Sequence, residues 1–211
     1  MKKYITLIAF LCSTTFTIAQ QQDSTVENVL FEIDLDSQIQ VLHILQSKQP
    51  NALHIADSVL ANYNDFYPPV LYAASRVLYD AKRKYEAGFI FYLAQLKARV
   101  DVSLCLDNTV TNILVTLNKV YGASINNFSL QHKDSFTNTI NKVINIVMTT
   151  DGNYDHRWVI LRGRFAGQIK ATDKVTNDDI ILPKEQWQEV KAIVVEAYKK
   201  NFFNFIKGKD R

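Results

Sequence analysis

The chain has 211 residues, of which 47% are hydrophobic and 21% are charged, and its 24 Lys and Arg against 21 Asp and Glu give a formal net charge of +3. This balance is typical of a globular protein and excludes disordered and collagen-like chains. Only 6 Gly and 4 Pro are present, too few for the many tight turns of an all-β sandwich.

The first nineteen residues have the pattern of an export signal. Residues 1–3 supply a positive start, and the apolar run over residues 5–11 is too short to span a membrane. Small residues precede position 20, so we predict a signal peptide over 1–19 that is cleaved after Ala19. Residues 20–211 then form a single helical domain in the periplasm or outside the cell, with no transmembrane span once the signal is removed.

Two alternatives remain for this N-terminus. It could stay uncleaved as an anchor, or Cys12 could carry a lipid, although Leu11 is larger than the residue that usually precedes a lipidated Cys. The short signal followed by Gln20 resembles the signals of exported Bacteroidota proteins. Loss of Lys2 and Lys3 would lower the net charge from +3 to +1, so the basic balance implies no acidic partner.

The first half of the mature chain predicts four helices after a short extended segment over 29–35. Asp36 or Ser37 can cap a helix that ends before Pro50, and Asn51 can cap the second. The third starts at Pro69, which suits a first helical turn, and carries an apolar stripe to residue 81. After a basic turn over 82–84, the fourth runs from residue 85 to about 99.

The second half predicts further helices separated by turns. Asp107 or Asn108 caps one that stops at Gly122, and residues 124–133 follow as a loop. Another helix starts at Asp134 or Ser135 and ends near the turn cluster 149–153. Residues 154–167 are expected to be helical, and Pro183 opens a long final helix with aromatic and Lys residues. We expect this last helix to pack on the bundle, although it also resembles a basic membrane-surface helix.

Residues 71–99 resemble a tetratricopeptide or Sel1-type helix pair. The resemblance rests on residues 72–74, on residues 84–87, and on Phe91 and Ala94. It implies a scaffold for protein contact; the alternative is an αα-hairpin of no particular family. The whole pattern predicts an all-α fold with about seven helices in αα-hairpins, forming a bundle or a short solenoid.

The densest polar cluster is Tyr154, Asp155, His156 and Arg157, which could form a ligand-binding site. On a helix the last three would point about 100° apart and could not share one ligand by themselves. The alternative is that Asp155 caps a helix start while Trp158 packs inward.

Other chemistry finds no support in the sequence. The four His lack the H-x-x-x-H spacing, and no Walker A, G-x-G-x-x-G, G-x-S-x-G or C-x-x-C sequence occurs. We therefore predict no metal, no cofactor and no catalytic residues. Lys and Arg form no long stripe, so nucleic acid is not an expected partner. Cys105 lies in an apolar stretch and is expected to be a buried structural thiol.

These observations predict an exported, non-catalytic protein that binds another protein in the cell envelope. Its binding face would be concave and lined by aromatic and Arg side chains, namely Tyr72, Tyr79, Tyr92 and Arg99. The competing hypothesis is a small-ligand binder or enzyme that uses His156 and Arg157, with an acidic side chain within hydrogen-bond reach. A third is a periplasmic immunity or inhibitor protein. The oligomeric state is left open.

Overall fold

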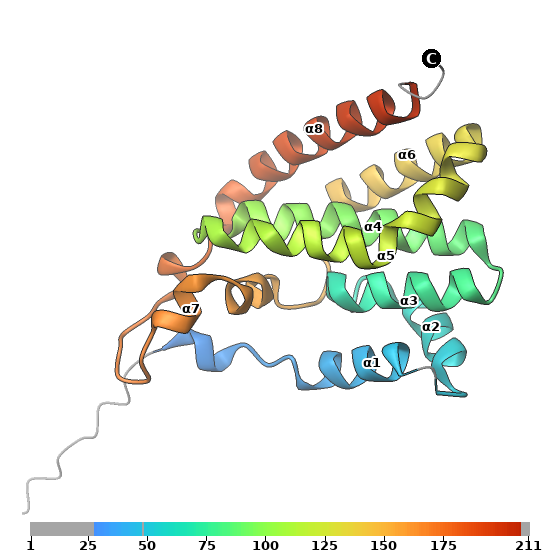
Figure 1. The fold of residues 1–211 in the computed structure, drawn as a ribbon. Coiled ribbons are helices and arrows are strands. Elements are labelled where there is room, and N and C mark those ends of the chain that lie inside the picture. The colour runs from blue at the N-terminus through green and yellow to red at the C-terminus, as the bar shows by residue number, and fades with distance from the viewer. Residues whose placement is uncertain (1–27, 48, 208–211) are drawn as a thin grey trace, which may run out of the picture.

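The computed structural model describes residues 28–47 and 49–207, and Figure 1 shows them as a stack of helices. The α-helices are α1 (Asp36–Gln46), α2 (Ala52–Ala61), α3 (Pro68–Asp80), α4 (Lys84–Leu104), α5 (Asn112–Gln131), α6 (Lys133–Thr149), α7 (Arg164–Gln168) and α8 (Trp187–Lys207). Short 3-10 helices are η1 (Val29–Glu32), η2 (Asn108–Thr111), η3 (His156–Arg162), η4 (Asn177–Asp179) and η5 (Lys184–Gln186). The described residues form two isolated β-bridges and no strand, which confirms the predicted all-α fold.

Helix α4 is the centre of the molecule. It packs against α3, α5, α6 and α8, and Figure 1 shows it in the middle of the stack, with α3 on one side and α6 and α8 on the other. A helix that is apolar all round has to be buried on every side. The side chains of α4 that are entirely buried are Ala87, Ile90, Phe91, Leu93, Ala94, Leu96, Ala98 and Leu104, with Asp101 among them.

Helices α3 and α4 form the helix pair that residues 71–99 predict. Pro68 and Pro69 occupy the first positions of α3, where a missing N–H costs nothing. The turn between the two helices contains Lys82 with a φ of 69°, a left-handed conformation in which glycine is more usual. Arg83 then ion-pairs with Asp57 of α2 and with Glu86 of α4. The resemblance to tetratricopeptide or Sel1 repeats stays a prediction.

One expected helix end is wrong. Helix α5 does not stop at Gly122 but continues to Gln131, so the loop expected over 124–133 is helical except for the bend at His132 before α6. Gly122 serves a close contact between helices: a Cβ added there would lie 3.1 Å from the Phe91 Cζ of α4. The missing side chain lets α5 approach α4, which the local sequence could not show.

Two further segments differ from the prediction. Within the expected extended segment 29–35, Val29–Glu32 form the 3-10 helix η1. The Asn28 side chain caps this helix, because it accepts a hydrogen bond from the Leu30 N–H at 3.2 Å. Residues 156–162 form a 3-10 helix, η3, and not the expected α-helix. Asp155 is the N-cap residue of η3. The prediction that Asp155 caps this segment while Trp158 packs inward is confirmed.

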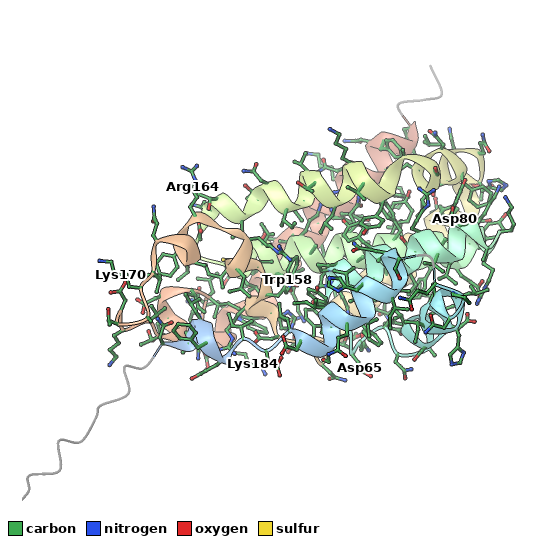
Figure 2. All side chains as sticks on the ribbon, turned by 60° about the horizontal axis from the view of Figure 1, so that its bottom comes forward. Asp65, Asp80, Trp158, Arg164, Lys170 and Lys184 are labelled. Atoms are coloured by element: carbon green, nitrogen blue, oxygen red, sulfur yellow. The ribbon has the colours of Figure 1, made fainter. Side chains whose placement is uncertain are left out.

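Residues 150–186 form a segment of loops and short helices, called the 150–186 segment below, that covers the C-terminal end of α4. The Leu106 N–H donates to the Ile180 carbonyl at 3.0 Å, and the Leu182 N–H donates to the Leu104 carbonyl at 2.9 Å. In Figure 2, Lys170 lies at one end of the molecule and Asp80 lies near the other end. Trp158 lies between them, on the inner side of this segment.

Candidate functional site

Three side chains of the 150–186 segment converge on one carboxylate of α4. Asp101 is entirely buried, and its two oxygens accept hydrogen bonds from the Tyr154 hydroxyl at 3.1 Å, from His156 Nδ1 at 2.7 Å and from Trp158 Nε1 at 2.7 Å. A buried carboxylate is tolerated when donors satisfy it in this way. Asp101 therefore holds residues 154–158 against α4.

His156 is oriented by this carboxylate and has one unused nitrogen. Because a carboxylate only accepts hydrogen bonds, Nδ1 carries the hydrogen of this contact. Nε2 is buried and has no hydrogen-bond partner among the described residues, and the Trp187 ring packs edge-on to the imidazole with centroids 4.9 Å apart. Beside it lies a cavity of about 10 Å³, lined in part by Lys97, Asp101 and Lys191, which is room for about one water molecule.

Two buried lysines lie beside this cluster, and each donates to one backbone carbonyl and to one side chain. Lys97 Nζ donates to the Tyr63 carbonyl at 3.1 Å and to Asn64 Oδ1 at 3.3 Å, and burial lowers the pKa of Lys97 to about 8. Lys191 Nζ of α8 donates to the Thr150 carbonyl at 3.0 Å and to Asp151, whose pKa this hydrogen bond lowers.

The four residues predicted for a ligand site do lie together. With Asn177, Lys184 and Trp187 they line an open depression of about 600 Å³. Arg157, however, is already bound to the Asp155 carboxylate at 2.7 Å, to Asn177 Oδ1 at 3.0 Å and to Glu32 at 3.5 Å. The Asp155 contact raises the pKa of Arg157.

A carboxylate-bound His with a free Nε2 is the arrangement of a general base. Here Nε2 is buried beside the Trp187 ring. The hydrogen bonds to Asp101 act as a structural clamp between residues 154–158 and α4. Sequence reasoning missed its centre, Asp101, although a single acidic residue between Val100 and Val102 in an apolar helix was the available signal.

The four residues expected to line a protein-binding face differ in how deeply they are buried. Tyr72 is 0% exposed and Tyr92 is 2% exposed, so the prediction that they form a surface is wrong. Tyr72 packs edge-to-face on Phe91, with ring centroids 5.4 Å apart, because α3 and α4 face each other here. Tyr79 and Arg99 are half-buried, and Arg99 lies over the Tyr198 ring of α8.

An apolar groove lies instead between α1, α2, α3 and α5. Its volume is about 620 Å³, within the range of ligand-binding pockets. Gln46 of α1 donates to the Tyr121 hydroxyl of α5 at 3.0 Å and so links the two sides. The residues that line it are Leu45, Gln46, Gln49, Pro50, Ala52, Leu53, Ala73, Arg76, Val77, Asp80, Val120 and Tyr121.

The groove exposes apolar surface on two sides. Leu53 of α2 is 40% exposed and Val120 of α5 is 58% exposed, whereas Arg76 and Asp80 of α3 form an exposed ion pair at 2.9 Å. An apolar surface with a polar rim marks a site of interaction in soluble proteins.

Among residues 28–47 and 49–207, no group of three or more His, Cys, Asp or Glu is arranged to hold a metal ion, and no helix has both the length and the apolar character to cross a membrane. Cys105 is buried, and burial raises the pKa of its thiol. Comparisons with protein-family models, curated proteins and solved structures found no match to this chain.

Proposed function

We propose that this protein is an exported, non-catalytic binding protein that holds a helical segment of a partner protein in the groove between α1, α2, α3 and α5. The observation that carries the proposal is the groove itself, an apolar trough of about 620 Å³ with Leu53 and Val120 exposed on opposite sides. Burying such side chains against a partner is the main favourable term in protein association.

The structure favours a helix as the bound segment. A partner strand would need a free sheet edge for its backbone hydrogen bonds, and the described residues contain no strand. An amphipathic helix satisfies its own backbone and offers apolar side chains at positions i, i+3, i+4 and i+7. Gln46, Gln49 and the Arg76–Asp80 pair would then contact its polar flanks.

Site-specific photo-crosslinking in the producing cell tests this function. A benzophenone amino acid placed at Leu53 or at Val120 should crosslink one common partner, and the crosslinked peptide should be amphipathic at helical spacing. The matched control is Val115, which is 69% exposed on α5 outside the groove and should give no crosslink to that partner. Equal crosslinking from Val115, or a peptide without helical periodicity, would contradict the proposal.

Affinity measurements then test the groove directly. The crosslinked segment, made as a peptide, should bind the wild-type protein, and Leu53→Glu should weaken binding about tenfold or more because a carboxylate would be buried. Val115→Glu should leave the affinity unchanged. Both positions are exposed, so both variants should keep the wild-type melting temperature.

Export is the second part of the proposal, and it rests on the N-terminal sequence, which lies outside the described residues. The mature protein, purified from its native cell, should begin at Gln20. Intact-mass measurement and N-terminal sequencing check this, and a chain that retains residues 1–19 in the cytoplasm would contradict it.

A further inference from the structure

A second cavity, separate from the groove, lies between α4, α5 and α8. Its volume is about 200 Å³, enough for a small organic molecule or for one side chain of a partner. The residues that line it are Tyr92, Gln95, Arg99, Asn126, Tyr198, Asn201, Phe202 and Phe205. One cation, several amides and several aromatic rings thus face one small space.

Arg99 is the charged group of this cavity, and no carboxylate of the described residues ion-pairs with it. Its Nη1 donates to the Gln95 carbonyl at 2.9 Å, and its guanidinium lies 5.3 Å from the centre of the Tyr198 ring. The guanidinium also lies close enough to the Tyr72 hydroxyl to lower its pKa, against the larger effect of burial. A guanidinium has five N–H donors in a planar fork that matches a carboxylate, so donors remain for a ligand.

The polar side chains around Arg99 are held in place by bonds among themselves. The Tyr198 hydroxyl donates to Gln95 Oε1 at 2.8 Å, and the Tyr92 hydroxyl donates to Asn126 Oδ1 at 3.0 Å. Because Asn126 accepts through its oxygen, its NH₂ group is left as a donor. A site whose donors are already oriented loses little entropy when a ligand binds.

The rest of the lining is aromatic. Phe202 is buried and packs edge-to-face on Tyr92, with ring centroids 5.5 Å apart, whereas Phe205 is 39% exposed. Aromatic side chains bury large apolar area and pair well with another ring. The cavity therefore offers an apolar part and a cationic part, about one small molecule in size.

We propose that the cavity between α4, α5 and α8 binds a carboxylate attached to an aromatic ring, with Arg99 on the carboxylate and Phe202 and Phe205 against the ring. The carboxylate could belong to a free aromatic acid or to the C-terminus of a polypeptide that ends in an aromatic residue. Neither source involves the groove, so this inference goes beyond the proposed function and stands independently of it.

Isothermal titration calorimetry on the mature protein tests the site with defined probes. We expect 3-phenylpropanoate or N-acetyl-Gly-Phe with a free carboxylate to bind with a Kd of about 1 mM or tighter. The matching amides, 3-phenylpropanamide and N-acetyl-Gly-Phe-amide, should bind at least about tenfold more weakly because they lack the charge that Arg99 recognises. The acid that binds more tightly identifies the source. If neither acid binds, or if acids and amides bind equally, the proposal is wrong.

Variants locate the binding. Arg99→Gln should weaken binding of the acid about tenfold or more, and Arg99→Lys should weaken it less, because it keeps the charge but loses the planar fork. Arg76→Gln is the matched control, since Arg76 lies at the groove, and it should leave binding unchanged. Phe205→Ala, at an exposed position, gives a second test if Arg99→Gln does not fold. Unchanged binding in Arg99→Gln, or in Phe205→Ala where Arg99→Gln does not fold, would overturn the assignment.

Discussion

Asp101 links three parts of the chain through one side chain. Its carboxylate belongs to α4, and its donors belong to the turn after α6 and to η3. Lys97, one turn earlier on α4, bonds the loop before α3 at the Tyr63 carbonyl. Buried charges of this kind contribute through the geometry they impose, because each one left without its partners would be costly.

Replacement of Asp101 by Asn should therefore strongly destabilise the protein. The amide keeps the size of the carboxylate but turns one acceptor oxygen into a donor that faces other donors. We expect the free energy of unfolding to fall by about 3 to 5 kcal/mol, measured by urea denaturation. Asp80→Asn, which breaks only the exposed pair with Arg76, should cost less than about 1 kcal/mol. Equal costs would show that the buried contacts do not matter.

We expect the buried Lys97 to make the free energy of unfolding increase with pH. Burial lowers its folded pKa from 10.5 to about 8, so between these values the unfolded chain binds a proton that the folded protein does not. The free energy of unfolding should then increase with pH, by at most about 1.4 kcal/mol per pH unit from this group. Lys97→Met should remove that increase.

The measurement compares urea midpoints of the wild type and Lys97→Met from pH 8 to pH 9.5. Higher pH is avoided because burial raises the pKa of Tyr92 to about 12, and ionisation of tyrosine in the unfolded chain lowers stability above pH 10. Lys119→Met, at an exposed position, should keep the wild-type increase. A parallel pH dependence in Lys97→Met and wild type would refute this account.

Helix packing depends on small residues where elements cross. A Cβ added to Gly88 of α4 would lie 2.2 Å from Cε1 of Phe136 on α6, and the Phe136 ring is entirely buried. The ring has no free space into which to move, so α4 and α6 can approach this closely only because position 88 has no side chain.

Gly88→Ala should accordingly separate α4 and α6 and destabilise the protein by about 1 to 3 kcal/mol. Gly167→Ala is the control, because a Cβ at Gly167 in α7 meets nothing within 4 Å. This second change should be neutral or stabilise by up to about 1 kcal/mol, since Ala restricts the unfolded chain. Thermal or urea unfolding of both variants decides the matter, and equal stability of the two would contradict the packing argument.

One hydrophobic core extends from Val29 near the start of the described chain to Ile206 near its end. The 150–186 segment contributes Trp158, Ile160 and Ile181 to this core, and the clamp at Asp101 joins the segment to α4. The segment and the helices thus share buried surface, and neither is expected to unfold separately.

Two spectroscopic probes test this cooperativity on the whole molecule. The two Trp, Trp158 and Trp187, lie in or directly after the 150–186 segment. Fluorescence therefore reports that segment, while far-ultraviolet circular dichroism chiefly reports the long helices. The urea midpoints from the two probes should coincide. A fluorescence transition at lower urea would show that the segment unfolds first.

Much of the fold follows from local rules, and the candidate sites follow much less. The Asp36–Gln46 and Pro68–Asp80 helices start close to the predicted positions, because signals such as proline act within one turn. The predicted cap of the first helix is wrong, since Leu35 and not Asp36 or Ser37 is its N-cap residue. The predicted surface residue Tyr72 is buried, since the opposite helix decides which face of α3 is covered. The groove near Leu53 was not predicted at all, because four elements from separate parts of the chain form it.

The sequence by itself determined the helical class, the α3–α4 pair and the inward packing of Trp158, since these depend on periodicity and on nearby caps. Only the tertiary structure decided that α5 continues through Gly122, where Phe91 occupies the space of the missing side chain. It also decided that Asp101, and not a residue of the 154–157 cluster, is the centre of the buried polar contacts. The physical reason is the same in both cases: burial and close contact are set by residues distant in sequence, and no local pattern records them.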